Sequence, residues 1–351
     1  MLMAFDYLVF IGRFEPFHNG HAAVARHALG QAKKLVFLVG SADAPRTTRN
    51  PWTVAERAVM IHAALDDATD RLLVRPLRDH LYNEAQWIAA VQRAVQEAIR
   101  ADGGASDARV GIIGQEKDAS SYYLQEFPQW PLVSVRHTET LSATELRRYL
   151  FEAAAEDGRG ALRMLQANLP AGVFDMLEAF RRNGSTYMSL VSEYRFIESY
   201  REAWASAPYP PTFVTADAVV VHSGHVLLVR RRAEPGKGLW ALPGGFVRQD
   251  ETVLAACLRE LKEETRLKLP VPVLRGSLSN RHVFDHPDRS QRGRTITHAF
   301  HFDFPVGELP AVKGGDDAEK ARWFPVSEAL DMGPQLFEDH LSILEFFLGR
   351  G

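Results

Sequence analysis

The stretch YLVFIGRFEPFHNGH (residues 7–21) sets the fold of the first half of the chain. It opens with an apolar run of strand length, and an alanine-rich helical pattern follows it. His18 and His21 lie where the strand passes into the helix. Gly20 between them lets the backbone approach a ligand closely, and Arg13 adds a permanent charge at the end of the strand. The stretch therefore predicts a strand–loop–helix unit that faces a ligand.

Further apolar runs of strand length follow and alternate with helical patterns. They are KLVFLVG (34–40), RLLVRPL (71–77), RVGIIG (109–114) and PLVSVR (131–136). Strands that alternate with helices form a parallel, doubly wound sheet, so the first half is predicted to be an α/β domain. In such sheets ligands bind at the carboxyl ends of the strands, where helix N-termini offer N–H groups and a positive dipole to phosphate.

The pattern changes in the second half. Helical patterns over about 142–206 end in SAPYPP (206–211), whose prolines cannot continue a helix. Period-two alternation around an HSGH turn (222–225), one strong helix over 251–265 and further strands then predict an α+β domain. The predicted division is a first domain at 1–182, a helical linker at 183–211 and a second domain at 212–351.

The composition agrees with two ordinary globular domains. At 351 residues the chain exceeds the usual size of one hydrophobic core. Its net charge of −3 gives no basic field for nucleic acid, and no segment is long and apolar enough to cross a membrane. The single cysteine, Cys257, forms no internal disulfide and reads as a small apolar core residue. We expect a cytoplasmic protein that binds neither nucleic acid nor membrane, and a homo-oligomer is compatible with the sequence.

A second phosphate-binding signal lies in LSATELRRYL (141–150). Ser142 and Glu145 have the spacing of a capping box, and Arg147, one turn into the helix, could reach phosphate over the helix start. Together with HxGH at 18–21, this stretch resembles the nucleotidyltransferase superfamily, whose HxGH signature binds the ATP triphosphate on a Rossmann-like domain. On the residues alone, a histidine pair at a helix start could instead cap the helix or bind a metal.

Finer matches resemble one branch, the nicotinamide-mononucleotide (NMN) adenylyltransferases of the archaeal type, over roughly residues 5–180. The matching stretches are IGRFEPFHNGH (11–21), VGSADAPRTTRNPWTVAERAVMI (39–61), YNEAQW (82–87) and LSATELRR (141–148). That family joins NMN and ATP to give NAD and pyrophosphate, and the resemblance implies Mg²⁺ or Mn²⁺ as cofactor and ATP as substrate.

The resemblance also implies residue roles. The catalytic group would be His18, His21 and Arg147, and the ATP-binding group Arg13, His18, His21, Arg49, Ser142, Thr144 and Arg147. Asn83 and Trp87 would bind NMN, with the indole stacked on the pyridinium in a cation–π contact of roughly 0.5 to 2 kcal/mol. On spacing alone, Trp87 is a core residue.

The chain departs from this family in two places and is ambiguous in a third. Many relatives carry glutamine where Glu15 stands and a polar residue where Asp43 stands, which leaves the NMN contacts near both positions open. Arg46 and Arg49 compete for one ATP-binding role, and we prefer Arg49 because it directly precedes Asn50-Pro51.

Three carboxylates crowd one helix face in the second half. In GGFVRQDETVLAACLRELKEETRL (244–267), Glu260, Glu263 and Glu264 lie at i, i+3 and i+4. A solvated acidic face paired with neighbouring basic residues would explain them, and so would divalent cations, since hard oxygen ligands select Mg²⁺ or Mn²⁺.

The full spacing resembles the Nudix box at every fixed position except the last glycine, where Arg266 stands, and the likeness extends over 212–345. A left-handed conformation there would cost about 1 kcal/mol for a residue other than glycine. The resemblance implies metal ligation by Glu260, Glu264, Glu263 and the Gly245 carbonyl, with Glu263 as ligand or catalytic base and with Glu251 and Arg259 as an orienting pair. Alternative bases are Asp316, Asp317 and Glu319.

The segment SNRHVFDHPDRSQRGRTITHAF (279–300) carries four arginines and three histidines. Such donors suit phosphates and a ribose, and the segment resembles one in Nudix proteins that act on ADP-ribose. We therefore expect a bifunctional enzyme of NAD metabolism that binds the small nucleotides ATP, NMN, NAD and ADP-ribose. Its first half would make NAD, and its second half would hydrolyse ADP-ribose to AMP and ribose 5-phosphate.

Three alternatives stay open at this point. The Nudix half could be a sensor of ADP-ribose or NAD that regulates the synthetase half. It could instead cleave another nucleoside diphosphate derivative. The first half could transfer adenylyl to flavin mononucleotide or phosphopantetheine, although YNEAQW argues against this.

Overall fold

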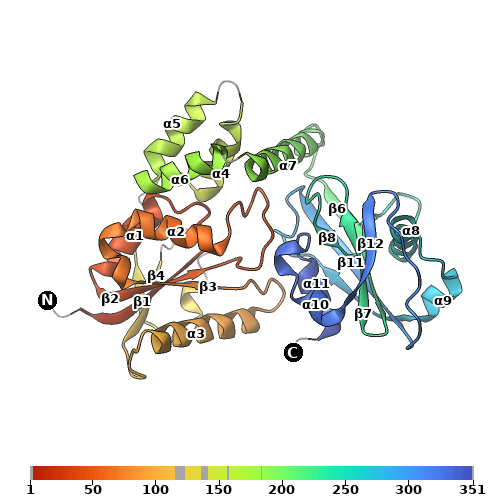
Figure 1. Ribbon diagram of the computed structural model, residues 1–351, viewed down its shortest axis with the longest axis horizontal. Helices are drawn as coiled ribbons and strands as arrows, with labels where there is room; N and C mark the ends of the chain where they lie inside the picture. The colour runs from red at the N-terminus through yellow and green to blue at the C-terminus, as the bar shows by residue number, and fades with distance from the viewer. Residues whose placement is uncertain (1–2, 115–122, 136–140, 156–157, 183, 350–351) are drawn as a thin grey trace. The chain divides into compact units, whose positions relative to one another are not determined.

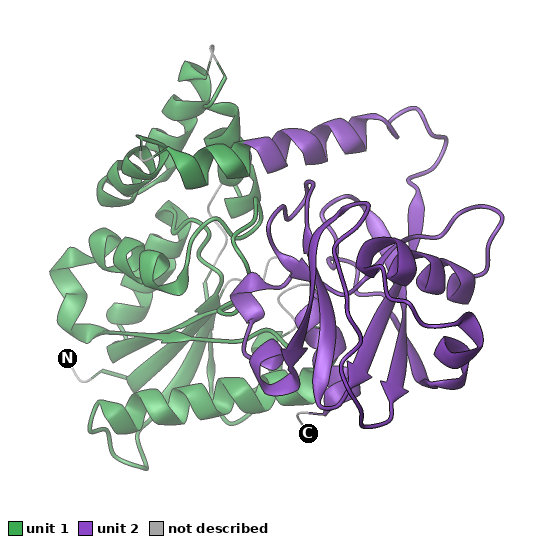
Figure 2. Cartoon of the chain, turned by 45° about the vertical axis from the view of Figure 1, so that its right-hand side comes forward, with its two compact units in different colours: residues 1–191 green, residues 192–351 purple. Residues whose placement is uncertain are grey.

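The computed structural model describes residues 3–114, 123–135, 141–155, 158–182 and 184–349. The chain divides into two compact units, Met1–Val191 and Ser192–Gly351 (Figure 2). The division falls inside helix α7 (Ser185–Glu202), within the segment predicted as a helical linker. None of the helices in the described ranges combines the length and the apolar character that a bilayer crossing requires.

Five parallel strands form the sheet of the first unit, in the order β3-β2-β1-β4-β5. They are β1 (Phe5–Gly12), β2 (Ala32–Val39), β3 (Leu72–Pro76), β4 (Val110–Gly114) and β5 (Leu132–Ser134). Each coincides with a predicted strand, although residue 136 of the last prediction lies outside the described residues, and the α/β prediction is confirmed. The strand order reverses between β1 and β4, which is where doubly wound sheets bind ligands.

Helices cover both faces of this sheet. The helices that alternate with the strands are α1 (Asn19–Leu29), α2 (Val54–Ala64), the 3-10 helix η1 (Asp66–Arg71) and α3 (Glu84–Ala101). Figure 1 shows α1 and α2 on one face and α3 on the other. Val91, Val95 and Ala98 of α3 pack against alternate residues of β1, as a strand buried on both faces requires. After β5 come the predicted helices, α4 (Ala143–Glu152), α5 (Arg159–Asn168), α6 (Ala171–Arg182) and α7.

The second unit has a mixed sheet in the order β10-β11-β6-β7-β12, with β8 paired to β7 and β9 paired to β6. Its strands are β6 (Thr212–His222), β7 (His225–Arg231), β8 (Trp240–Ala241), β9 (Gly244–Phe246), β10 (Leu278–Phe284), β11 (Arg294–Phe304) and β12 (Ala318–Pro325). Its helices are α8 (Val253–Thr265), α9 (Val271–Gly276), α10 (Val326–Leu330), the 3-10 helix η3 (Gly333–Gln335) and α11 (His340–Leu348). The α+β prediction is therefore confirmed.

The HSGH turn joins β6 and β7 as predicted. Ser223 and Gly224 both have positive φ, 49° and 72°, which is the conformation of a two-residue hairpin whose twist matches its strands. The turn fixes the register of β7, and β7 ends at Arg231.

Helix α8 presents two different faces. Its apolar face buries Ala256, Cys257 and Leu261 in the core beside β6, so Cys257 is a core residue as predicted. Its C-cap residue is Arg266, which has the left-handed φ of 54° that the missing glycine would have adopted. Since the apolar face is fixed against the sheet, the carboxylates of α8 come to lie over β9.

Candidate active sites

The two histidines of the HxGH stretch hold the start of α1. His18 is the N-cap, and its Nδ1 accepts a hydrogen bond from the Gly20 backbone N–H at 3.2 Å. The His21 Nδ1 accepts one from the His18 N–H at 3.4 Å, and the two rings stack with centroids 3.7 Å apart. Since both Nδ1 atoms accept, each neutral ring carries its proton on Nε2, where it can be donated. Helix capping is thus confirmed and leaves a donor role for both rings.

Aromatic side chains fix the position of His21. The rings of Phe14 and Phe17 lie 5.0 and 5.5 Å from it, and that of Phe10 lies 6.1 Å away. Phe14, which directly follows Arg13, has a positive φ of 56°. A residue other than glycine keeps this conformation only where its surroundings enforce it, and such strain is common at ligand-binding loops.

Arg147 joins α4 to the HxGH loop. Its Nη1 donates to the Glu15 carbonyl at 2.7 Å, and its Nη2 donates to the Thr144 hydroxyl at 3.0 Å. The capping box of Ser142 with Glu145 is present at the start of α4, as predicted. The structure therefore brings the two predicted ATP-binding motifs together from segments more than 120 residues apart.

Three arginine charges gather at this place. Burial, followed by the charges of Arg13 and Arg49, lowers the pKa of Arg147. Arg46, the competitor of Arg49, donates to the Pro51 carbonyl at 2.7 Å and forms an ion pair with Glu56 at 2.7 Å. Because the charge of Arg49 acts on Arg147, Arg49 is favoured for the ATP-binding role, which stays a prediction.

The two residues at which the chain departs from the family pattern, Asp43 and Glu15, each lie beside an arginine. The Asp43 carboxylate forms an ion pair with Arg78 at 2.8 Å. The Glu15 carboxylate is buried next to Arg57, 3.3 Å from its Nε, and burial raises the pKa of Glu15 to about 7. Both acidic residues therefore serve local contacts with these arginines.

Arg57 of α2 was missed by the sequence analysis. Its Nη1 donates to the carbonyls of Arg13 and Gly40, at 2.8 and 2.7 Å, and its side chain is only 1% exposed. It thereby links the ends of β1 and β2 to α2, at the base of the loop that leads from β1 to His18. A charged residue inside the apolar helical pattern AERAVMI was the available signal.

Replacing Arg57 by methionine is expected to lower the free energy of unfolding by about 3 to 5 kcal/mol, because the Glu15 carboxylate would stay buried without its charge partner. Urea unfolding of the full chain measures this loss. Arg182→Met is the matched control, since it removes only the exposed ion pair with Glu178 and is expected to cost at most about 1 kcal/mol. Equal losses in the two variants would contradict the role of Arg57.

Both predicted NMN-binding residues lie at the start of α3, near the carboxyl end of β3. The Asn83 Oδ1 caps the helix by accepting from the Gln86 N–H at 3.0 Å. The half-buried Trp87 packs edge-on to Tyr123 and beside Phe127, with ring centroids 6.0 Å away in each case. Trp87 is thus partly buried against the core of the first unit, and the NMN contacts of both residues stay predictions.

The second unit contains a cavity of about 430 Å³ above α8 and β9. All four predicted metal ligands line it, and so does Arg259 of the predicted orienting pair, whereas Glu251 does not. These lining residues are Gly245, Arg259, Glu260, Glu263 and Glu264. The Glu264 Oε2 accepts from the Gly244 N–H at 3.0 Å. A Cβ on Gly245 would lie 2.6 Å from the Glu260 carboxylate, so a larger residue would force this carboxylate to move.

Arg259 organises the carboxylates around it. It binds Glu251 through two hydrogen bonds, at 2.6 and 3.0 Å, and this contact lowers the pKa of Glu251. Its Nη1 also donates to Glu260 at 2.7 Å and to Glu263 at 3.0 Å. Within the described ranges, no three His, Cys, Asp or Glu side chains already stand together as a metal cage. The oxygen donors nevertheless suit Mg²⁺ or Mn²⁺, and Arg259 binds two of the carboxylates.

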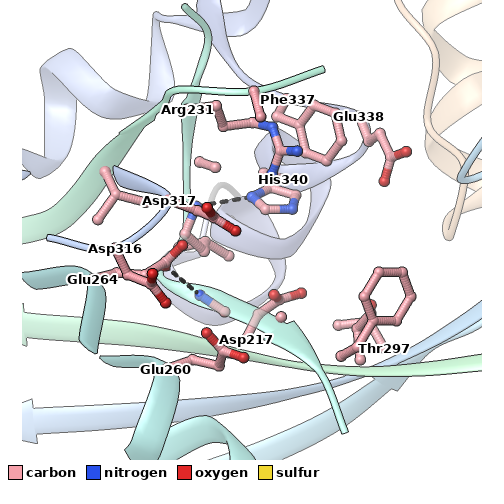
Figure 3. A pocket seen from close by; sticks show the side chains of 18 of the residues that line it. Asp217, Arg231, Glu260, Glu264, Thr297, Asp316, Asp317, Phe337, Glu338 and His340 are labelled. Atoms are coloured by element: carbon pink, nitrogen blue, oxygen red, sulfur yellow. Dashed lines mark hydrogen bonds between the residues drawn. The ribbon is translucent and has the colours of Figure 1, made fainter. Parts of the chain in front are cut away.

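Burial shifts the titration of several groups in the cavity. It raises the pKa of Glu264 to about 8 and that of Asp217, on β6, to about 7. The His340 Nδ1 accepts from the Leu242 N–H at 2.8 Å, and burial lowers the pKa of this ring to about 3. Figure 3 shows all three side chains at the cavity. Asp217 and His340 were missed, although a lone carboxylate in the apolar strand TADAVVV was a signal for the first.

Other predicted residues are divided between the cavity and the surface. Asp316 and Asp317 line the cavity, whereas the third proposed base, Glu319, lies next to Arg230 with an N–O distance of 3.8 Å. Of the arginines in 279–300, Arg289 and Arg292 reach the cavity. Arg289 forms a buried two-bond ion pair with Asp339 at 2.8 and 3.0 Å.

Comparisons with known proteins agree with both sites. A family model described as Cytidylyltransferase-like matches residues 9–148, and one described as NUDIX domain matches residues 211–345. A nicotinamide/nicotinic acid mononucleotide adenylyltransferase of Acinetobacter baylyi is 34% identical over 197 residues, 56% of this chain and 96% of that protein. An ADP-ribose pyrophosphatase of Methanocaldococcus jannaschii is 35% identical over 165 residues, 47% of this chain and 86% of that protein.

A solved structure matches the whole chain. It is a bifunctional NMN adenylyltransferase/ADP-ribose pyrophosphatase from Francisella tularensis, crystallised with AMP and a manganese ion. The two chains are 34% identical with a TM-score of 0.89, and the match covers 98% of each. The chain therefore belongs to the family of bifunctional NMN adenylyltransferase/ADP-ribose pyrophosphatases, as its sequence motifs predicted.

Proposed function

We propose that the first unit transfers the adenylyl group of ATP to NMN. An oxygen of the NMN phosphate attacks the α-phosphorus, the bond from this phosphorus to the bridging oxygen breaks, and pyrophosphate leaves. Arg13, Arg49 and Arg147 would hold the triphosphate, while the Nε2–H groups of His18 and His21 would donate to the phosphoryl oxygens as charge builds on them. Positioning and electrostatic stabilisation carry this kind of reaction, which needs no covalent help from the protein.

The hydrogen bond that joins Arg147 of α4 to the loop of His18 and His21 is the observation that most favours this assignment, because it brings both predicted ATP-binding motifs to one place. Ser142 and Thr144 would complete the ATP site at the N-terminus of α4, where N–H groups face an anion. Asn83 and Trp87 would hold the nicotinamide end of NMN at the start of α3.

We propose that the second unit hydrolyses ADP-ribose to AMP and ribose 5-phosphate. Glu260, Glu264, Glu263 and the Gly245 carbonyl would hold Mg²⁺ or Mn²⁺. When bound, such an ion polarises a phosphoryl oxygen and lowers the pKa of a bound water. Arg259, anchored on Glu251, would keep the carboxylates in place. Glu263 would serve as ligand or as base, and Asp316 and Asp317 are the other bases within the cavity.

Incubating the full chain with two substrate sets tests both halves. With NMN, ATP and Mg²⁺, we expect NAD and pyrophosphate in equal amounts, and flavin mononucleotide or phosphopantetheine offered instead should be poor acceptors. With ADP-ribose and Mg²⁺, we expect equal amounts of AMP and ribose 5-phosphate. Saturable ADP-ribose binding without AMP release would instead identify the second unit as a sensor, and faster cleavage of another nucleoside diphosphate derivative would revise its substrate.

A further inference from the structure

Two arginines of the second cavity differ from the others that line it. Arg259 and Arg289 are both bound by carboxylates, as described above. Arg231, Arg232 and Arg292 also line the cavity and form no ion pair with any described residue. Of these three, Arg231 and Arg292 each lie over a phenylalanine ring of the same cavity. We call these two residues the stacked arginines.

Two neighbours fix the plane of the Arg231 guanidinium group. It ends β7, and its Cζ lies 4.0 Å from the centre of the Phe337 ring. Its Nε donates to the Pro235 carbonyl at 2.9 Å, which leaves the terminal N–H groups of the guanidinium for another acceptor. Figure 3 shows Arg231 and Phe337 side by side, across the cavity from Glu260.

Arg292 lines the same cavity, next to β9. Its Cζ is 4.9 Å from the centre of the Phe246 ring, and Phe246 directly follows Gly245, the predicted metal-ligating backbone position. Its Nε is buried and has no hydrogen-bond partner among the described residues. A buried guanidinium nitrogen without an acceptor is unfavourable unless a ligand supplies one.

The two positive charges act on each other and on nearby carboxylates. Burial and the charge of Arg292 lower the pKa of Arg231, whereas the charges of Glu338, Glu264 and Asp317 raise it. A phosphate bound by both guanidinium groups would give their free N–H groups charged acceptors. Because stacking fixes the planes of both guanidinium groups, each can present two parallel N–H donors to a phosphate.

We propose that Arg231 and Arg292 together bind the diphosphate of ADP-ribose, each from its phenylalanine platform. The identity of the substrate rests on the proposed function; the binding of a diphosphate by this pair does not. The stacked arginines would hold the phosphoryl oxygens that face away from the α8 carboxylates. They are thus binding residues that align the scissile bond with the metal site.

Two measurements on the full chain test this inference. The first is kcat/KM for ADP-ribose, which we expect Arg231→Ala and Arg292→Ala each to lower by about 10- to 100-fold, since each removes a charge-assisted contact to phosphate. The second is the Kd of inorganic pyrophosphate in the presence of Mn²⁺, measured with Arg147→Ala in every chain so that the pyrophosphate site of the first unit is removed. This Kd should rise at least about 10-fold in both variants. Arg231→Lys keeps the charge but not the planar donor pair, so it should recover only part of either loss.

The controls separate binding from folding. Arg230→Ala changes the neighbouring residue of β7, which does not line the cavity, and both measurements should stay within twofold of wild type. The Kd of Mn²⁺ alone should also stay within twofold in the Arg231 and Arg292 variants, because this Kd depends on the carboxylates of α8, which the substitutions leave in place. If both alanine variants keep wild-type pyrophosphate affinity, the stacked arginines do not bind the diphosphate. If wild type binds pyrophosphate through them but does not cleave ADP-ribose, the proposed function alone fails.

Discussion

Glu264→Gln should lower ADP-ribose hydrolysis by about 10³-fold, which is the largest effect we expect in the second unit. A divalent ion contributes several kcal/mol of transition-state stabilisation, and each 1.4 kcal/mol corresponds to about a factor of ten in rate. Glu264 is the most buried of the three α8 carboxylates and the one that Arg259 does not bind. Glutamine cannot ionise to bind the ion, so the variant lacks the ligand most available to it.

The same substitution should leave the fold intact. A glutamine oxygen can still accept the hydrogen bond from the Gly244 N–H. Burial raises the pKa of Glu264 from 4.5 to about 8 in the folded chain, so the folded state holds this proton more tightly than the unfolded state does. Stability from this group is therefore present below pH 4.5 and is lost as the pH rises to 8. Glutamine never ionises, so the variant should be at least as stable as wild type at pH 8.

Three measurements decide the role of Glu264: AMP release from ADP-ribose, Mn²⁺ affinity by titration calorimetry, and urea unfolding at pH 8. We expect the first two to fall sharply while stability is kept. Glu319→Gln is the matched control, since Glu319 lies outside the cavity lining, and its hydrolysis rate should be unchanged. Wild-type turnover in Glu264→Gln would remove Glu264 from the set of metal ligands.

The elements of both units could be predicted because their signals are local. Each strand of the first sheet is a short apolar run, and the carboxylates of α8 follow from spacing along a single helix. The left-handed backbone conformation of Arg266 could likewise be predicted, because Arg266 stands where the Nudix box has its last glycine.

Other parts of the sites depend on contacts between distant segments, which spacing does not record. Arg231 ends a strand more than 100 residues before Phe337, the ring on which it lies. His340 belongs to the last helix but accepts its hydrogen bond from the backbone of Leu242. Arg57 likewise donates to the carbonyls of Arg13 and Gly40 only because α2 packs beside the ends of β1 and β2.

His18→Ala should lower NAD formation by about 10²- to 10³-fold, the loss expected when one donor to a developing oxyanion is removed. His18 also caps α1, and the loss of a cap alone costs about 1 kcal/mol of stability. The two roles therefore have to be separated before the rate is interpreted.

His18→Asn makes that separation. Asparagine is among the best N-cap residues, so this variant should recover the stability that alanine loses, yet it lacks the Nε2–H donor of the imidazole. Pyrophosphate release from NMN and ATP, measured beside urea unfolding, gives both quantities. Since the ring stacks on His21 at 3.7 Å, part of the loss will come from a less ordered His21, and the double variant with His21→Ala should then lose less than the sum of the single effects. If His18→Asn restores NAD formation together with stability, the histidine acts only as a helix cap, and the triphosphate is held by the arginines alone.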